Sequence, residues 1–185
     1  MRVLAHLSLL TATSVILTRF FGAMLPIAGV GALRLSFGEV PIALAGLLFG
    51  PVAGGTVGAL ADIIGFPLNP YGGPYFPLLT LTSALHGVLP PLILRLYARP
   101  PYRWQQLFGA VLVNDVITAM VLQTFFLSIL LNQAALVLLP MRVAARCLLV
   151  PVYTTLLHLA TASFYTLEAN RVAWATTASR HRGSP

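Results

Sequence analysis

Long apolar runs separated by short polar connections occupy nearly the whole chain, and this pattern leaves few folds open to it. Only 8% of its 185 residues are charged, whereas a typical soluble domain has about 25%. Such a chain cannot cover its surface in water, but a helix of roughly 20 apolar residues can cross a lipid bilayer. We therefore predict an all-α integral membrane bundle of six transmembrane helices, which forms a single domain over residues 1–185.

Proline and glycine divide the apolar runs into helices, of which the second and third are short. The predicted helices cover residues 3–25, 39–50, 52–66, 76–98, 104–131 and 139–170. Pro51 separates the second helix from the third, because proline lacks the N–H that a helix interior needs. Between the first two helices, residues 26–37 form a connection that contains β-capable residues. Glycine recurs every four residues from Gly46 to Gly58, a spacing that allows close helix packing.

The residue types present exclude several classes of function. All 11 basic residues are arginine, and the phosphate-binding loop of ATPases requires lysine, so another subunit must supply any ATPase activity. The single cysteine, Cys147, excludes an internal disulfide and a multi-cysteine metal site. The chain has no HExxH or GxSxG motif, so we predict neither catalysis nor a metal or other cofactor. We expect its scattered histidines to be packed or interfacial.

The net charge of +7 indicates membrane orientation rather than nucleic-acid binding. The arginines stand at the ends of the apolar runs and do not collect on one face, as a nucleic-acid-binding surface would require. Six spans place both termini on one side. That side carries Arg2, Arg95, Arg99, Arg103, Arg171, Arg180 and Arg182, and the other carries Arg19, Arg34, Arg142 and Arg146. Because cytoplasmic loops are richer in arginine, we predict a cell-membrane protein with both termini in the cytoplasm.

Charged, amide and aromatic side chains gather at the outward end of the predicted bundle and indicate a small-molecule site. The candidate binding residues are Arg34, Ser36, Glu39, Asp62, Tyr71, Tyr75, Phe76, Thr80, Gln123, Thr124 and Arg142. Arginine offers a planar fork for carboxylates, and aromatic rings can stack on a flat heterocycle. Ionisable side chains inside a bilayer are costly, which makes them functional candidates.

A structural role is the alternative for several of these residues. Asp62 could instead hydrogen-bond to a neighbouring helix, and Arg142 could extend its head to the membrane interface. The aromatic rings could belong to the belt that lines membrane interfaces. For Asp115, which is not among the candidates, we favour a structural role near the cytoplasmic end, beside the arginines of residues 95–103.

Small residues share one face of the first predicted helix. Ser8 and Ala12 lie four residues apart, on one face with Ala5, and this spacing lets another helix approach closely. The partner is either another helix of this chain or a separate membrane subunit. The residues alone leave both possibilities open.

Two stretches of the sequence carry a family resemblance. One is RLSFGEVPIALAGLLFGPVAGGTVGALADIIGFPLNPYGGPYFPLLTLTSALHGVLP, from Arg34 to Pro90, and the other is LPMRVAARCLLVPV, from Leu139 to Val152. They resemble the folate-type S components of energy-coupling-factor (ECF) vitamin transporters. The resemblance implies capture of a folate-like small molecule from outside and release inside by reorientation. It also implies a transmembrane coupling subunit and two ATPase subunits as partners, and Ser8 and Ala12 are the nearest equivalent of the AxxxA pattern that docks the coupling subunit in such families.

Folate suits the candidate residues. Its flat pterin suits aromatic faces with an amide or carboxylate partner, and its two tail carboxylates suit Arg34 and Arg142. The stretch QTFFLSILLNQ departs from the family pattern, because Gln123 stands where the family has asparagine. The alternatives are an S component for another small anionic or heterocyclic vitamin, an integral-membrane lipid-modifying enzyme, and a non-transporting assembly protein.

Overall fold

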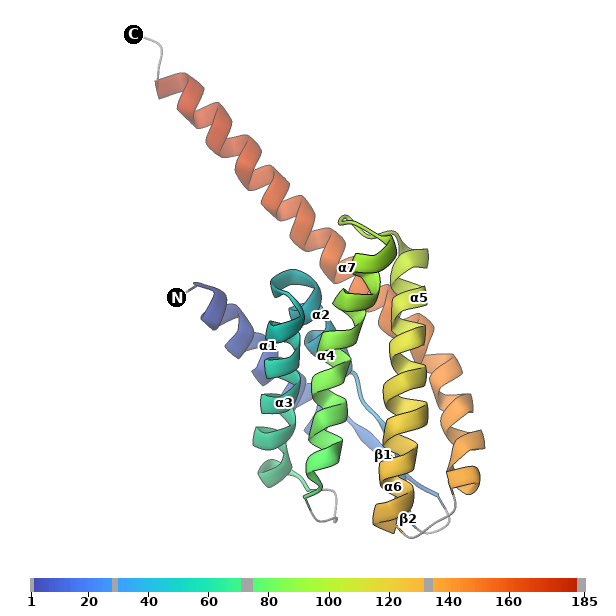
Figure 1. Cartoon of the computed structure of the whole chain (residues 1–185). Helices are drawn as coiled ribbons and strands as arrows, with labels where there is room; N and C mark the ends of the chain where they lie inside the picture. Colours follow the sequence, from blue (N-terminus) through green and yellow to red (C-terminus); the bar gives the residue numbers. More distant parts are fainter. Residues whose placement is uncertain (1, 28–29, 71–74, 132–134, 183–185) are drawn as a thin grey trace.

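Helices make up most of the computed structural model, which describes residues 2–27, 30–70, 75–131 and 135–182. In chain order the elements are α1 (Arg2–Arg19), β1 (Ala23–Ile27), β2 (Val30–Leu35), α2 (Glu39–Phe49), α3 (Pro51–Leu68), α4 (Pro77–Tyr97), α5 (Trp104–Asp115), η1 (Val116–Leu122), α6 (Gln123–Leu131) and α7 (Ala135–Arg182). The π-helix η1 joins α5 to α6 without a break, so these residues form six helical rods and one hairpin (Figure 1). The predicted bundle of six helices is confirmed.

Four of the rods are long and apolar enough to cross a membrane. They are Pro51–Leu68, Pro77–Tyr97, Trp104–Phe126 and Arg142–Leu167, with mean hydropathy between 1.3 and 1.6. The apolar helices Val3–Arg19 and Glu39–Phe49 are shorter. The second helix is therefore short, as predicted, whereas α3 continues past Phe66 and reaches 18 residues.

Both ends of the chain lie at one end of the bundle, together with the turn between α2 and α3 (Figure 1). The hairpin, the end of α3 and the start of α4 lie at the opposite end (Figure 1). We call the first the terminal end and the second the hairpin end. This arrangement agrees with the even number of passes that the sequence predicted.

The first helix is shorter than predicted, because it ends at Arg19 and not at residue 25. The chain then forms an antiparallel hairpin of β1 and β2, with a register irregularity next to Pro26. Pro26 would stop a helix only at about residue 25; the earlier end coincides with Gly22, a poor helix former, and with the pairing of residues 23–27 in the hairpin. The last helix is longer than predicted, because α7 continues to Arg182, beyond the predicted end at residue 170.

The glycine repeat brings α4 into backbone contact with α2 and α3. A Cβ atom at Gly46 or at Gly54 would overlap the carbonyl oxygen of Gly87, and one at Gly58 would overlap that of Ser83. The close packing predicted from the spacing of these glycines is confirmed. Because side chains are absent at the crossing, the three helices approach as one closely packed unit.

We expect Gly87→Ala to destabilise the protein. The added Cβ would meet the backbone of Gly54, which cannot move aside as a flexible side chain could, and such overpacking costs about 1–3 kcal/mol. The measurement is the thermal unfolding midpoint of the purified protein in detergent. Gly109→Ala is the matched control, because its Cβ would only come within 3.4 Å of Tyr97 Oη. Equal midpoints for both variants would contradict the close crossing.

Candidate functional site

Arg142 of α7 meets two of the predicted site residues on the neighbouring rod. It is buried, with 4% of its surface exposed. Nη1 donates to the carbonyl oxygen of Ala119 at 2.9 Å and to Thr124 Oγ1 at 3.3 Å, and it lies 3.5 Å from Gln123 Oε1. The structure therefore brings Arg142, Thr124 and Gln123 together, and the burial of Arg142 does not fit a head that extends to the membrane interface.

The π-helical turn η1 supplies the carbonyl oxygen at this contact. In a π-helix the backbone hydrogen bonds span five residues and the turn is wider than in an α-helix. The hydroxyl of Thr124 donates to the Ala119 carbonyl at 3.2 Å, and Arg142 donates to the same oxygen. The wide turn thus presents a backbone acceptor to a side chain from another helix, a feature that the sequence did not reveal.

Arg146, one turn from Arg142 on α7, lies at the centre of a group of charged side chains. Its Nη1 is 2.8 Å from Glu39 Oε2 and 2.7 Å from Asp115 Oδ1, and its Nη2 is 3.0 Å from Glu39 Oε1. The contact with Glu39 is bidentate, a geometry in which arginine binds carboxylates strongly. Arg146 and Asp115 are buried and Glu39 is partly buried. These contacts tie α2, α5 and α7 together.

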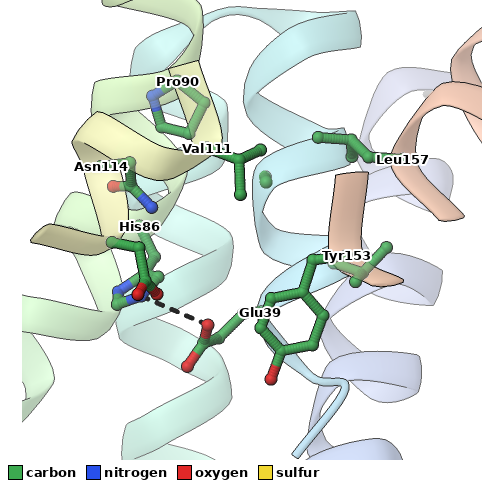
Figure 2. A pocket seen from close by; sticks show the side chains of 10 residues that line it. Glu39, His86, Pro90, Val111, Asn114, Tyr153 and Leu157 are labelled. Atoms are coloured by element: carbon green, nitrogen blue, oxygen red, sulfur yellow. Dashed lines mark ion pairs between the residues drawn. The ribbon is translucent and has the colours of Figure 1, made fainter. Parts of the chain in front are cut away.

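His86 of α4 joins the same group, and we call Glu39, His86, Asp115 and Arg146 the ion cluster. His86 Nδ1 is 2.9 Å from the carbonyl oxygen of Thr82, to which it must donate because a carbonyl only accepts. Its Nε2 is 3.1 Å from Thr118 Oγ1. The same nitrogen is 3.4 Å from Glu39 Oε2 (Figure 2). His86 is packed, as expected for the histidines, and it adds α4 to the helices that the ion cluster connects.

A small cavity lies beside the ion cluster. Its walls include Glu39, His86, Asn114, Asp115 and Tyr153 together with apolar residues such as Pro90, Val111 and Leu157 (Figure 2). The space open to the centres of water molecules is about 20 Å³, which is room for roughly one water. In this structure the cavity therefore has room for a water-sized occupant beside the ion cluster.

Asp62 of α3 makes its contacts inside the protein, with α1 and α4. Its Oδ1 lies 2.9 Å from Arg19 Nη2, and its Oδ2 accepts from Thr80 Oγ1 at 2.8 Å. The Thr80 hydroxyl is also 2.8 Å from Tyr75 Oη. This is the interhelical alternative considered for Asp62. It connects Asp62, Thr80 and Tyr75, three of the predicted residues, in one series of hydrogen bonds.

Ser36 and Phe76 complete the predicted residues whose contacts are described. The carbonyl oxygen of Ser36 accepts from Tyr153 Oη at 2.7 Å. The ring of Phe76 meets the ring of Phe126 edge-on, with 6.4 Å between their centroids. Two predicted residues, Tyr71 and the side chain of Arg34, fall outside the described residues.

Sequence reasoning missed Arg146, His86 and Arg19, which hold the predicted residues in place. It also placed Asp115 near the arginines of residues 95–103, and that placement is wrong, because Asp115 is 3% exposed and contacts Arg146. An acid deep in an apolar helix needs a partner of opposite charge. The available signal was the spacing of Arg142 and Arg146, which puts both guanidinium groups on one face of α7.

The small residues of α1 lie on its exposed surface. Ser8, Ala12 and Ala5 are all exposed, and Leu9 and Ile16 beside them are 66% and 48% exposed. The intrachain packing considered for this face is therefore not what the structure shows. The alternative of a separate membrane subunit stays open.

Comparisons with known proteins identify relatives of this chain. The family "ECF transporter, substrate-specific component" matches residues 2–168. The folate transporter FolT of Clostridium novyi (strain NT) is 27% identical over 156 residues, which are 84% of this chain and 86% of that protein. In both comparisons the match extends over most of the chain.

Two solved structures are similar in fold. A crystal structure of FolT bound with folic acid has a TM-score of 0.74 at 27% identity, and the alignment covers 89% of this chain and 95% of that one. The S component of a bacterial ECF transporter has a TM-score of 0.57 at 20% identity, with 92% and 97% covered. The second likeness shows the shared fold alone.

The family match decides between the functions left open by the sequence. It excludes the lipid-modifying enzyme and the assembly protein, because it covers nearly the whole described bundle. It also agrees with the six helical rods of the structure. The chain belongs to the substrate-specific components of ECF transporters: it is a multi-pass membrane subunit that binds the substrate of a transporter, works with an ECF module and is not an enzyme.

Proposed function

We propose that this S component captures folate or a folate derivative at the outer side of the membrane and delivers it inward by reorienting with its coupling module. The observation that carries this proposal is the likeness to FolT, which holds in sequence over 84% of the chain and in fold over 89%. The solved FolT structure contains folic acid. The chemistry of the residues at the hairpin end supports the same ligand.

Arg142 is the residue that we propose holds a carboxylate of the folate tail. Its Nη1 contacts neutral oxygens of Ala119 and Thr124. A hydrogen bond from arginine to a carboxylate is roughly twice as strong as one to a neutral acceptor, so an incoming carboxylate can compete for this guanidinium. Arg146 already contacts two carboxylates, and we assign it to the scaffold. Arg34 is the candidate for the second carboxylate of the tail.

The pterin ring would lie against side chains around the start of α4. Tyr75 and Phe76 directly precede this helix, and aromatic rings stack on flat heterocycles. Gln123 lies close to Arg142, so its amide, which can both donate and accept, would meet the amide or carboxylate of the glutamate tail. Of the remaining candidates, Ser36, Tyr71 and Thr124 would line the same site, whereas Glu39, Asp62 and Thr80 would support it through their contacts with neighbouring helices.

We expect Arg142→Ala to weaken folate binding by about 1–3 kcal/mol, the scale of a lost charge-assisted hydrogen bond. This corresponds to an increase of about 5- to 150-fold in the dissociation constant, measured by isothermal titration calorimetry of the protein in nanodiscs. Arg95→Ala is the matched control, because Arg95 is an exposed arginine in the last turn of α4. If folate binds equally well to both variants, Arg142 is not part of the site.

The proposed partners are a transmembrane coupling subunit and two ATPase subunits. The exposed face of α1 with Ser8 and Ala12 is the proposed docking surface for the coupling subunit, because small residues let another helix approach closely. We propose that the terminal end, where both chain ends lie (Figure 1), faces the cytoplasm. Arg95 in the last turn of α4, and Arg99 and Arg103 between α4 and α5, support this orientation.

The decisive experiment identifies the ligand directly. The protein is extracted in mild detergent, and any small molecule that co-purifies is identified by mass spectrometry. Folate at near-stoichiometric occupancy, confirmed by titration of the ligand-free protein, is the expected result. Tight binding of another anionic or heterocyclic vitamin, with no response to folate, would replace folate as the substrate and leave the transporter class unchanged.

A further inference from the structure

We propose that Arg19 is a positioning residue that couples the proposed ligand site of this S component to its proposed docking helix. The inference rests on the proposed function, which assigns Tyr75 to the ligand and the exposed face of α1 to the coupling subunit. The structure adds a series of described contacts between these two regions. Arg19 stands at the point where they meet.

Arg19 is the last residue of α1, and it is held against the end of α3. Only 5% of its surface is exposed. Its Nη2 is 2.9 Å from Asp62 Oδ1, and its Nη1 donates to the carbonyl oxygen of Asn69 at 2.8 Å. Asn69 Nδ2 donates back to the carbonyl oxygen of Arg19 at 3.1 Å. This reciprocal pair of hydrogen bonds fastens the end of α1 to the residue that follows α3.

Helix α3 provides the space that the arginine occupies. A Cβ atom at Gly65 would come within 2.7 Å of Arg19 Nε and 3.3 Å of its Cγ. With glycine at this position, the guanidinium can lie against the backbone of α3, between Asp62 and Asn69. Arg19 is therefore closely packed against α3, in contrast to a surface arginine that makes a single exposed contact.

In addition to its contact with Asn69, Arg19 is connected to Tyr75 by a series of polar contacts. Asp62 contacts Arg19 through Oδ1 and Thr80 through Oδ2, and the Thr80 hydroxyl reaches Tyr75 Oη. The series crosses from α1 through α3 to the start of α4. Arg19 thus holds Asn69 directly and Tyr75 through two intermediates, so both described ends of the connection between α3 and α4 depend on one guanidinium.

The proposed docking face belongs to the same helix as Arg19. A partner that seats on Ser8 and Ala12 and tilts α1 would also displace Arg19, because the backbone hydrogen bonds of the helix fix the positions of these residues relative to one another. The movement reaches Tyr75 through the contacts described above. Coupling between two binding sites is reciprocal, so a ligand that fixes Tyr75 must change the affinity for the partner by the same factor.

The test compares folate affinity in two states of the protein, both in nanodiscs: the isolated S component and the complete transporter without ATP. The ratio of the two dissociation constants is the coupling factor. For the wild type we expect this ratio to differ from one by about 5- to 150-fold, the usual range of coupling between sites. Asp62→Asn, which removes the charge that holds Arg19 and keeps the side-chain size, should bring the ratio toward one. Arg19→Lys should give an intermediate ratio, because lysine keeps the charge but cannot reach Asp62 and Asn69 together.

Two further variants complete the test, one as a second break in the series of contacts and one as a control. Thr80→Val breaks the path between Asp62 and Tyr75 without touching the ion pair, so it reports on the coupling even if Asp62→Asn does not fold. Arg95→Gln, at an exposed arginine, should leave the ratio at the wild-type value.

A purely structural role for Arg19 predicts a different result from coupling. Such a role would lower the thermal midpoint and weaken folate binding equally in both states, so the ratio would not change. An unchanged ratio in Asp62→Asn and Thr80→Val, or a wild-type ratio of one, would overturn the coupling. Failure of the proposed function looks different, because the wild type would then not bind folate in either state.

Discussion

Arg146→Ala is expected to prevent stable folding of this S component. The substitution leaves Glu39 and Asp115 without the guanidinium that lies between them, and Asp115 is 3% exposed. Removing one partner of a buried ion pair costs about 3–5 kcal/mol, which is a large part of the stability of a typical domain. The measurements are the yield of monodisperse protein in detergent and the thermal unfolding midpoint.

A rescue experiment separates lost charge compensation from lost packing. The triple variant Arg146→Met, Glu39→Met and Asp115→Val removes every full charge from these three positions and fills them with apolar side chains. Replacing a buried ion group by well-packed apolar residues is often neutral or stabilising, so much of the lost stability should return. The matched single control is the exposed Arg95→Ala. If Arg146→Ala is as stable as this control, the ion cluster does not hold the helices together.

The double variant Ser8→Leu and Ala12→Leu is expected to abolish vitamin uptake by cells while the isolated protein still binds folate. Two leucines on the exposed face of α1 would keep a partner helix from approaching closely, but they face away from the contacts of Arg19 and Asp62. Uptake of labelled folate, co-purification with the coupling subunit and calorimetric folate affinity are measured on the same variant.

The control places similar changes on another helix. Ala144→Leu with Cys147→Leu alters two exposed positions of α7, and it should leave uptake and assembly near the wild-type level. Loss of folate binding together with assembly in the α1 variant would indicate a folding defect. Normal assembly of that variant would move the docking surface away from α1.

The arrangement of helices could be predicted because it follows from local properties of the sequence. Run length and hydropathy predicted the six rods, and Gly50 and Pro51 predicted the break between α2 and α3. Gly50 adopts a φ of 100° at this break, a conformation that favours glycine. The hairpin was not predicted, because Pro26 indicates only that a helix ends by about residue 25, and the pairing of β1 with β2 is not a local property of the sequence.

The pairing of charged side chains could not be predicted in the same way. Glu39 and Arg146 are 107 residues apart in sequence, and Arg19 and Asp62 are 43 apart. Which charges meet depends on the depth and rotation of each helix in the bundle, which hydropathy does not define. The meeting of Arg142 with Gln123 was easier to foresee, because each was expected in the outward half of one of the last two rods.

The distribution of the ion cluster along the chain has a consequence for how the protein is made. Its two acids belong to α2 and α5, whereas Arg146 belongs to α7, which is synthesised after both. On insertion scales, a charged residue at the centre of a membrane helix costs about 2.5–3.5 kcal/mol. Until α7 arrives, the nascent bundle therefore holds two acids without Arg146, the one arginine of the ion cluster, which contacts both of them in the finished bundle. The charged contacts that join α2, α5 and α7 can therefore form only after α7 has been inserted.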